Sequence, residues 1–506
     1  MFFFVNQYLL SNDSSIEHAE MKRLKLFKDH NAEAKLVTRN YDQIIHATLQ
    51  RFGLTDDQLV NMYDFFAGTT DYVGHDLHVS DLNLPIEYQV GTGNNYQEVK
   101  DGDRLVCIVY FTGGTVGLVN HIDWFDIAGN VTLRQQYDLR GFKSVDQFIG
   151  ENGQISFERY YRPDQTIYME RYYVKSVQNT PINSLNVLKN YQGHDRFFDS
   201  EEDLFAFFLD EVNKANGENN IFIADRPAVA IQPVMNMQTA AKKYLWMAMN
   251  HVNDGNNLKS GPLNPMLQGP LTTDLDKWDG IITMTEAQAE MIQKRIGDKK
   301  PVYAINGVPV KSNNQRTDMK YRIAGQIIYV GRLGEDKQTG KLIEIFTRIH
   351  KKVPTAKLTL YGYGNPDDVN RYKKQVEDAG LTGIVVFAGY QVKLDPVYNT
   401  AQLFMDTSRI DAQPLAMGEA LSHGVPVVTY DYMYGPSEMV KSGVNGELVP
   451  LNNAKKMEKA AVDILTNPKL LQKLSTGAYD SLDNISNLKT WKQWSRVWAS
   501  KELAES

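Results

Sequence analysis

The C-terminal part of the chain alternates short apolar runs with longer amphipathic stretches, and this alternation constrains the fold more than any other feature. The apolar runs occupy residues 326–330, 357–361, 384–387, 401–405 and 425–430. Apolar strands that alternate with helices are typical of a parallel sheet covered on both faces. We therefore predict a doubly wound α/β domain, with any ligand beyond the carboxyl ends of its strands.

The N-terminal part begins with the same rhythm. Residues 2–6 and 34–38 are apolar runs that flank an amphipathic stretch, where Ser14 is a good N-cap for a helix reaching residue 28. A strand, a helix and a strand at this spacing predict a parallel βαβ unit. The rhythm returns later, with expected helices at 200–213 and 285–294 and strands at 220–225, 243–249, 280–284 and 302–305.

Between these parts the pattern changes to one of short alternating strands. Apolar and polar residues alternate in 105–110, 131–137 and 155–161, and glycine- or asparagine-containing turns separate the runs. This pattern predicts an antiparallel β module inserted into the first α/β domain. Arginines and tyrosines interleave at 159–162 and 171–173, which fits either strand faces or a surface for a sugar chain or a partner protein.

A chain of 506 residues is too long for one hydrophobic core. We expect an N-terminal Rossmann-like domain in two parts, 1–84 and 181–312, around an inserted module at 85–180. A C-terminal Rossmann-like domain should follow at 313–487, and a last helix at 488–506. Trp491, Trp494 and Trp498 share one face of that helix, which should pack against a domain.

Composition excludes several classes of protein. The net charge of −7 disfavours a general nucleic-acid surface. Cys107 is the single cysteine, which rules out an internal disulfide framework and fits a reducing compartment. No apolar run approaches the roughly 18 residues that span a bilayer, and the first residues lack the features of a signal peptide. We expect a cytoplasmic protein with at most a peripheral contact to the membrane.

Residues that follow the C-terminal strands predict an anion site. Gly331 ends one strand, and Arg332 and Lys337 follow it five positions apart, so that both cations could neutralise a diphosphate. Gly362 follows the next strand, where a glycine lets the backbone approach a nucleotide closely. Tyr390 follows a third strand and could lie against a nucleobase.

The most specific motif is an acid-x7-acid loop from Asp411 to Glu419, followed by a helix and a Gly-x-Pro turn into a strand. A carboxylate at Glu419 could accept both hydroxyls of a ribose. A tight loop at 434–438 precedes another helix, whose N-terminal amides would favour an anion.

In this order and spacing, these motifs resemble the family-4-type retaining glycosyltransferases of the two-Rossmann GT-B fold. Residues 14–20, the inserted module and 431–437 look like the poly(glycerol-phosphate) α-glucosyltransferases of wall teichoic acid. They look equally like the accessory-Sec O-glycosyltransferases that modify serine-rich adhesins. The resemblance implies a UDP-sugar as the donor or bound ligand, no metal, and a β module that recognises the acceptor and pairs subunits.

Several positions depart from the pattern that the resemblance implies. Ser15 stands where the relatives place a glycine against the diphosphate-sugar, and Ala248 where they place a histidine that contacts the sugar. Asp411 is one methylene shorter than the usual Glu. Ala412 and Pro414 replace glycines whose amides bind sugar and phosphate, and Pro414 has no N–H to donate.

His251 lies three residues after Ala248, near a second histidine of some relatives, and could substitute beside Asn250 in the donor and acceptor cleft. Arg332, Lys337 and Glu419 keep the expected residue types. Asp411, Lys337 and Arg332 would be the catalytic set of an active enzyme, with Ser15, Gly331, Gly362, Tyr390 and Glu419 completing the nucleotide-sugar site.

This distribution favours a weakly catalytic or non-catalytic partner subunit of a UDP-GlcNAc-dependent protein O-glycosyltransferase. Its partners would be a catalytic paralogue and a Ser/Thr-rich acceptor protein. The alternative is an active retaining hexosyltransferase that moves glucose or GlcNAc to poly(glycerol phosphate) teichoic acid or protein. A sugar- or nucleotide-binding regulatory protein outside this pathway is a third possibility.

Overall fold

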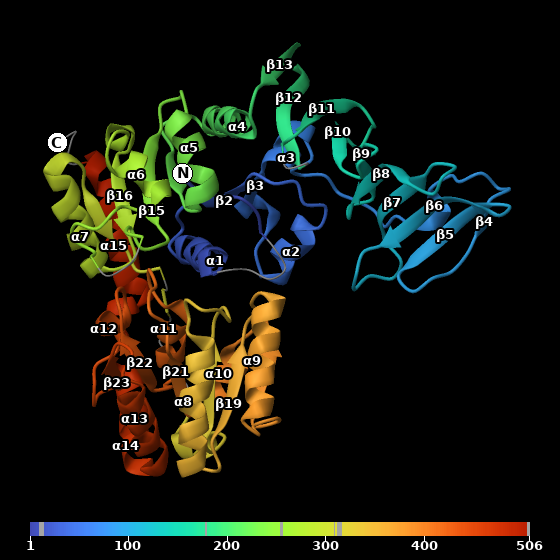
Figure 1. Cartoon of the computed structure of the whole chain (residues 1–506). Coiled ribbons are helices and arrows are strands. Elements are labelled where there is room, and N and C mark those ends of the chain that lie inside the picture. The colour runs from blue at the N-terminus through green and yellow to red at the C-terminus, as the bar shows by residue number, and fades with distance from the viewer. Residues whose placement is uncertain (10–14, 178–179, 254–256, 308, 311–315, 503–506) are drawn as a thin grey trace. The chain divides into compact units, whose positions relative to one another are not determined.

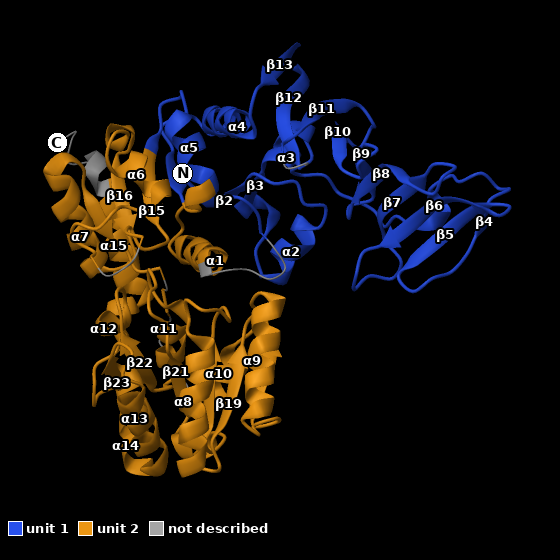
Figure 2. Ribbon diagram, in the orientation of Figure 1, with its two compact units in different colours: residues 1–11, 34–224, 229–242 blue, residues 12–33, 225–228, 243–506 orange. Residues whose placement is uncertain are grey.

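The structure, a computed structural model, describes residues 1–9, 15–177, 180–253, 257–307, 309–310 and 316–502. The chain divides into two compact units (Figure 2). The first consists of residues 1–11, 34–224 and 229–242, and the second of residues 12–33, 225–228 and 243–506. Ser14, the expected cap of the first helix, lies outside the described residues.

The first parallel sheet is built from short apolar strands. It has seven strands in the order β17-β16-β15-β14-β1-β2-β3 (Figure 1). The first unit contributes β1 (Phe2–Asn6), β2 (Ala34–Thr38), β3 (Leu59–Asn61) and β14 (Ile221–Ala224). The other strands are β15 (Lys242–Met247), β16 (Gly280–Thr283) and β17 (Val302–Ala304). The expected strands at 2–6 and 34–38 are confirmed, and every residue of β1 is buried.

The helices that accompany this sheet are α1 (Ser15–Asp29), α2 (Ile45–Arg51), α3 (Met62–Ala67), α4 (Glu201–Ala215), α5 (Pro227–Asn236), α6 (Pro265–Leu271) and α7 (Glu286–Ile296). Local capping explains two of their starts. The Ser200 hydroxyl accepts from the amide of Asp203 at the start of α4, and the Thr285 hydroxyl accepts from the amide of Gln288 at the start of α7.

The inserted module is a single antiparallel sheet of ten strands, β4 to β13 in chain order. Its strands are β4 (Gln89–Val90), β5 (Tyr96–Asp101), β6 (Arg104–Phe111), β7 (Val119–Phe125), β8 (Val131–Asp138), β9 (Phe142–Ile149), β10 (Ile155–Tyr161), β11 (Ile167–Lys175), β12 (Pro181–Tyr191) and β13 (His194–Phe198). The sheet continues beyond residue 180, where the sequence pattern placed its end. β12 is rich in polar residues, so alternation alone did not reveal it.

The interleaved arginines and tyrosines of the module lie on β10 and β11, except for Arg162, which follows β10. Tyr160 is buried, and Arg171 is buried with its guanidinium donating to the Tyr63 hydroxyl at 2.8 Å and to Glu201 at 2.8 Å. These contacts tie β11 to α3 and to the start of α4.

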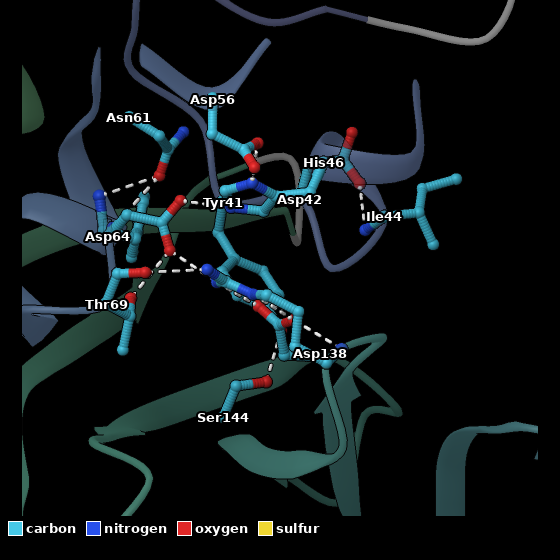
Figure 3. A network of polar contacts seen from close by, with 12 residues as sticks. Tyr41, Asp42, Ile44, His46, Asp56, Asn61, Asp64, Thr69, Asp138 and Ser144 are labelled. Atoms are coloured by element: carbon cyan, nitrogen blue, oxygen red, sulfur yellow. Dashed lines mark hydrogen bonds and ion pairs between the residues drawn. The ribbon is translucent and has the colours of Figure 1, made fainter. Parts of the chain in front are cut away.

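A polar network joins the module to the helices of the first unit (Figure 3). The two ring nitrogens of His46 on α2 lie 2.7 Å from Asp56 and 2.9 Å from Asp64. Arg140, in the turn between β8 and β9, pairs with Asp64 at 2.6 Å and with Asp138 at 2.8 Å. The network therefore anchors this hairpin to α2 and α3.

The C-terminal sheet is parallel, with six strands in the order β20-β19-β18-β21-β22-β23. Its strands are β18 (Gln326–Val330), β19 (Lys357–Tyr361), β20 (Val385–Gly389), β21 (Leu403–Asp406), β22 (Val427–Asp431) and β23 (Gly446–Pro450). Its helices are α8 (Thr339–Lys352), α9 (Pro366–Asp378), α10 (Asp395–Thr400), α11 (Leu415–Ser422), α12 (Pro436–Met439), α13 (Ala454–Thr466) and α14 (Pro468–Asp480). All five expected strands are present, although the last three are displaced by one or two residues. Two parallel α/β sheets with an inserted antiparallel module confirm the predicted GT-B fold class.

The last helix, α15 (Asn487–Glu502), packs on α1 within the second unit. Trp494 is almost fully buried, and its ring lies edge-on to Phe27 and stacks on Trp246. Trp491 and Trp498 also lie edge-on to Phe27. The expectation that the tryptophan face packs against a domain is confirmed.

Candidate functional site

The second unit contains a cavity of about 1300 Å³. It lies over the carboxyl ends of β18, β19 and β21, and α1 and α11 also line it, which is where ligands bind in doubly wound sheets. The sequence-predicted residues that line it are Asn250, Gly331, Arg332, Lys337, Gly362, Tyr390, Asp411 and Glu419. The cavity therefore brings together residues that are far apart in the chain.

The glycines after β18 and β19 let two loops lie in contact. A Cβ atom on Gly362 would collide with the carbonyl oxygen of Gly331, and the φ of Gly362 is +131°. Arg332 follows on the first loop, with a side chain 57% exposed and an ion pair to Asp336 at 2.7 Å. Its guanidinium is accessible at the rim of the cavity.

Lys337 is held by the first acid of the acid-x7-acid loop. Its ammonium nitrogen lies 2.6 Å from Asp411, and the lysine side chain is only 13% exposed. Burial by itself would lower the pKa of Lys337, but the carboxylates of Asp411 and Asp406 raise it above its usual value. Lys337 is thus a fixed positive charge whose present partner is Asp411.

The loop after Asp411 offers few donors. The backbone N–H of Ala412 is engaged by the Asp411 side chain at 2.8 Å. Pro414 is the N-cap residue of α11 and has neither an N–H nor a capping side chain. The amide of Tyr434 donates to the Asp411 carbonyl at 2.9 Å, which fixes the loop at 431–435 against this one. These contacts hold the loop in place. Because the N–H of Ala412 is engaged and Pro414 has none, neither residue offers a backbone donor to a ligand.

Glu419 is paired from two sides. Lys22 of α1 forms an ion pair with its Oε1, and the Tyr398 hydroxyl donates to its Oε2 at 2.8 Å. Burial would raise the pKa of Glu419, yet Lys22 and Tyr398 lower it below its usual value, so the carboxylate is charged. Sequence reasoning missed both partners.

Tyr390 also contacts α1. Its hydroxyl lies 3.0 Å from Nε2 of His18, and its ring is edge-on to Tyr363 with centroids 6.1 Å apart. These three side chains line the cavity together with Lys22. His18 and Lys22 are about one helical turn apart on α1, so their side chains share a face of the helix. In the sequence, this spacing was the only indication that the two residues lie together.

The residues after β15 divide between the cavity and the interior. Ala248 and Asn250 line the cavity. His251 is fully buried, and its Nε2–H donates to the Leu258 carbonyl at 2.8 Å. Burial lowers the pKa of His251, so the ring is neutral. Ser15 is the first residue of α1, but its side chain is outside the described part of the chain.

The loop at 434–438 differs from its expected role. The helix α12 begins inside this stretch, at Pro436, and has only four residues, too few for a useful helix dipole. Instead, the carboxylate of Glu438 accepts hydrogen bonds from the amides of Glu286 and Ala287 at the start of α7, and burial raises the pKa of this carboxyl group. No group of three or more His, Cys, Asp or Glu side chains among the described residues could hold a metal ion.

Two protein-family models match the chain. Residues 313–481 match the model of glycosyl transferases group 1, and residues 88–192 match the GtfB middle domain. The second match falls on the ten-stranded module, and the first on the domain that supplies Lys337, Asp411 and Glu419. The chain is therefore similar to the group 1 glycosyltransferases over its C-terminal domain and to the GtfB middle domain over the inserted module.

Curated relatives of this group cover most of the chain at low identity. The poly(glycerol-phosphate) alpha-glucosyltransferase of Bacillus subtilis is 22% identical over 97% of this chain and 74% of its own length. The poly(ribitol-phosphate) alpha-N-acetylglucosaminyltransferase of Staphylococcus aureus is 23% identical over 97% of both. The GtfA subunit of the UDP-N-acetylglucosamine–peptide N-acetylglucosaminyltransferase of Streptococcus gordonii is 22% identical over 87% of this chain and 85% of its own.

Solved structures share the fold. The pneumococcal O-GlcNAc transferase GtfA, crystallised with UDP and GlcNAc, aligns with a TM-score of 0.83 at 17% identity over 99% of this chain and 98% of that one. A chain of a GtfA/B complex aligns with a TM-score of 0.79 at 19% identity over the full length of both. No helix among the described residues has the length and apolar character needed to cross a membrane.

Proposed function

We propose that this protein is the weakly catalytic or non-catalytic partner subunit of a UDP-GlcNAc-dependent transferase that O-glycosylates Ser/Thr-rich surface proteins. One observation supports the proposal: two cations and a carboxylate line one cavity where we expect the diphosphate and the ribose, while the positions expected to hold the hexose offer little to bind it. A UDP-sugar would be its bound ligand. The partners would be a catalytic paralogue and the acceptor protein.

The phosphate side of the cavity supports nucleotide binding. Lys337 provides a fixed ammonium group and Arg332 an exposed guanidinium, and both suit a diphosphate. Glu419 supplies a charged carboxylate for the ribose hydroxyls. These groups belong to the same cavity, so a single nucleotide could contact all three.

The residues at the positions expected to contact the hexose favour slow transfer of the sugar. Ala248 lines the cavity with a methyl group that can neither donate nor accept a hydrogen bond. Pro414 lacks an amide donor, and the amide of Ala412 is already used by Asp411. The loss of one preorganised donor costs about 3–4 kcal/mol of transition-state stabilisation. Together these losses favour a subunit that binds a nucleotide-sugar without rapid transfer.

The relatives support a paired function. A GtfA/B complex has been crystallised with a chain of this fold, and the present chain has a match to the GtfB middle domain. We extend this pairing to the present protein and predict a paralogue with an intact Glu-x7-Glu loop and a histidine after the corresponding strand. Cell fractionation would test the predicted cytoplasmic location with peripheral membrane contact.

A transfer assay tests the proposal. Labelled UDP-GlcNAc and a Ser/Thr-rich peptide are incubated with this chain alone, with the paralogue alone and with both. We expect little transfer by this chain alone and more transfer, with co-purification, when both are present. Transfer at an ordinary enzymatic rate by the isolated chain would overturn the proposal.

An active retaining hexosyltransferase is the second candidate, and the similarity to the B. subtilis glucosyltransferase over 97% of this chain favours it. Lys337 and Arg332 would stabilise the leaving diphosphate and Asp411 would contact the sugar, with front-face attack by a teichoic-acid or protein hydroxyl. The combined change Asp411→Glu, Ala412→Gly and Pro414→Gly separates the two. It should raise UDP-sugar turnover at least about tenfold, about 1.4 kcal/mol, for a degenerate site, and little for an active one.

A further inference from the structure

One face of α1 contacts two residues of the predicted nucleotide site. His18 and Lys22 are one turn apart, and both line the cavity. His18 meets the hydroxyl of Tyr390, and Lys22 meets the carboxylate of Glu419. α1 therefore reaches the positions expected for the base and for the ribose.

The carboxylate of Glu419 already has a donor on each oxygen. Lys22 donates to Oε1 and the Tyr398 hydroxyl donates to Oε2 at 2.8 Å. Tyr398 is buried and belongs to α10, so it is a fixed part of the site. Lys22 is 29% exposed and carries a long flexible side chain, so it is the donor that can leave.

We propose that the Lys22 ammonium group takes, in the unliganded protein, the place on Glu419 that the ribose hydroxyls of a nucleoside diphosphate require. Nucleotide binding and the Lys22–Glu419 ion pair then exclude one another. The inference rests on the proposed function, because it assumes that Glu419 binds ribose. It adds a competitor supplied by the chain itself.

This competition has a measurable consequence. If UDP binds only when the Lys22–Glu419 ion pair is open, its apparent dissociation constant equals the intrinsic constant divided by the fraction of molecules in which the pair is open. Removal of the Lys22 charge should therefore tighten nucleotide binding, which is the opposite of the usual effect of removing a cation near a diphosphate. The sign of the change separates competition from simple attraction.

The test is the dissociation constant of UDP measured by calorimetry on the full chain. Lys22→Met keeps the aliphatic stem and should tighten UDP binding about two- to fivefold, the range expected for removing one solvent-accessible ion pair. Lys25→Met is the matched control, because Lys25 is an exposed lysine of the same helix that lines the same cavity. It should leave UDP binding unchanged or weaken it slightly.

Two further measurements show whether the tighter UDP binding depends on Glu419 and on the ribose. In a Glu419→Gln background, Lys22→Met should no longer tighten UDP binding, because the competing pair is already gone. Inorganic pyrophosphate has no ribose, so Lys22→Met should weaken its binding or leave it unchanged. Thermal unfolding of each variant verifies that the fold is kept.

The outcomes are distinct. Unchanged or weaker UDP binding by a folded Lys22→Met variant would overturn the competition while leaving the proposed function in place. Tightening that persists without Glu419, or that extends to pyrophosphate, would also overturn it. Absence of UDP binding by the wild-type chain and by Lys22→Met would overturn the proposed function together with this inference.

Discussion

At the scale of the residue, the proposed nucleotide binding depends most on Lys337. Its ammonium group is desolvated and lies 2.6 Å from Asp411, with Asp406 also close enough to raise its pKa. A diphosphate that enters the cavity would share this charge with Asp411. Without Lys337 the two aspartates would repel the ligand.

Lys337→Ala should therefore weaken UDP binding by about ten- to a hundredfold, because a hydrogen bond to a charged group contributes about 1.5–3 kcal/mol. Calorimetry on the folded variant measures the change. Lys341→Ala is the control, since Lys341 lies close by in the chain, in the first turn of α8, and pairs with Glu344 at the surface. Equal effects of the two substitutions would show that Lys337 has no special part in binding.

The sequence predicted some of the site's residues and could not predict others. Arg332, Lys337 and Asp411 follow strands, and the topology of a parallel sheet brings such positions to one edge. Glu419 was expected to begin a helix, but it lies inside α11, which begins at Leu415. The partner of Glu419 was missed, because Lys22 lies 397 positions away and no local pattern links the two. The roles of these residues in binding remain predictions that the experiments above test.

At the scale of the element, α15 joins the last part of the chain to α1. Trp494 contacts Phe27 and Trp246, and the guanidinium of Arg23 lies over its ring at 5.6 Å. Truncation of a fully buried tryptophan leaves a cavity that the surrounding side chains cannot fill.

Trp494→Ala should destabilise the second unit by about 3–5 kcal/mol. Trp491→Ala should cost less, because Trp491 is only partly buried and rests on Phe27 and His30. Thermal unfolding followed by circular dichroism compares the two variants. A larger loss of stability for Trp491→Ala would contradict the packing described for this helix.

The polar network around His46, which joins the module to α2, predicts that the stability of the protein depends on pH. Burial alone would lower the pKa of His46, but Asp64 and Asp56 outweigh it and raise the pKa above its usual value. The stabilisation from this histidine is thus fully present below its unfolded pKa of about 6.5, and is lost as the pH rises through the raised folded pKa.

The difference in unfolding temperature between the wild type and His46→Gln should be largest near pH 5.5 and should shrink toward pH 8.5. Asp64→Asn removes one of the two carboxylate partners of His46 and should reduce the pH dependence. A difference that grows with pH would contradict the assignment of a charged imidazolium between Asp56 and Asp64.

The elements were predictable where apolar residues run together and less so elsewhere. β1, β2, β18 and β19 were predicted to the residue. Every residue of β1 is buried, and the other three strands bury most of their large apolar side chains. β23 was missed, since its sequence Gly-Glu-Leu-Val-Pro contains only two large apolar residues and its pairing with β22 is set by the sheet. The polar β12 was missed for a similar reason.

At the scale of the whole molecule, the chain shares the fold of the solved structures, while we propose that several side chains of its cavity depart from those of an active transferase. The fold depends on buried strands and helix packing, which tolerate substitutions in a ligand cavity. Catalysis depends on donors placed within about 1 Å of their required position, and a few substitutions remove it. A protein of this kind can therefore retain nucleotide binding and structural pairing after it has lost rapid transfer.

The most direct test of this claim is the rate at which the isolated chain releases UDP from UDP-GlcNAc or UDP-glucose, in the same preparation whose UDP affinity has been measured. We predict measurable UDP binding with release far below the typical enzymatic rate of about 10 per second. Rapid release from either donor by the chain alone, with or without an acceptor, would contradict the account.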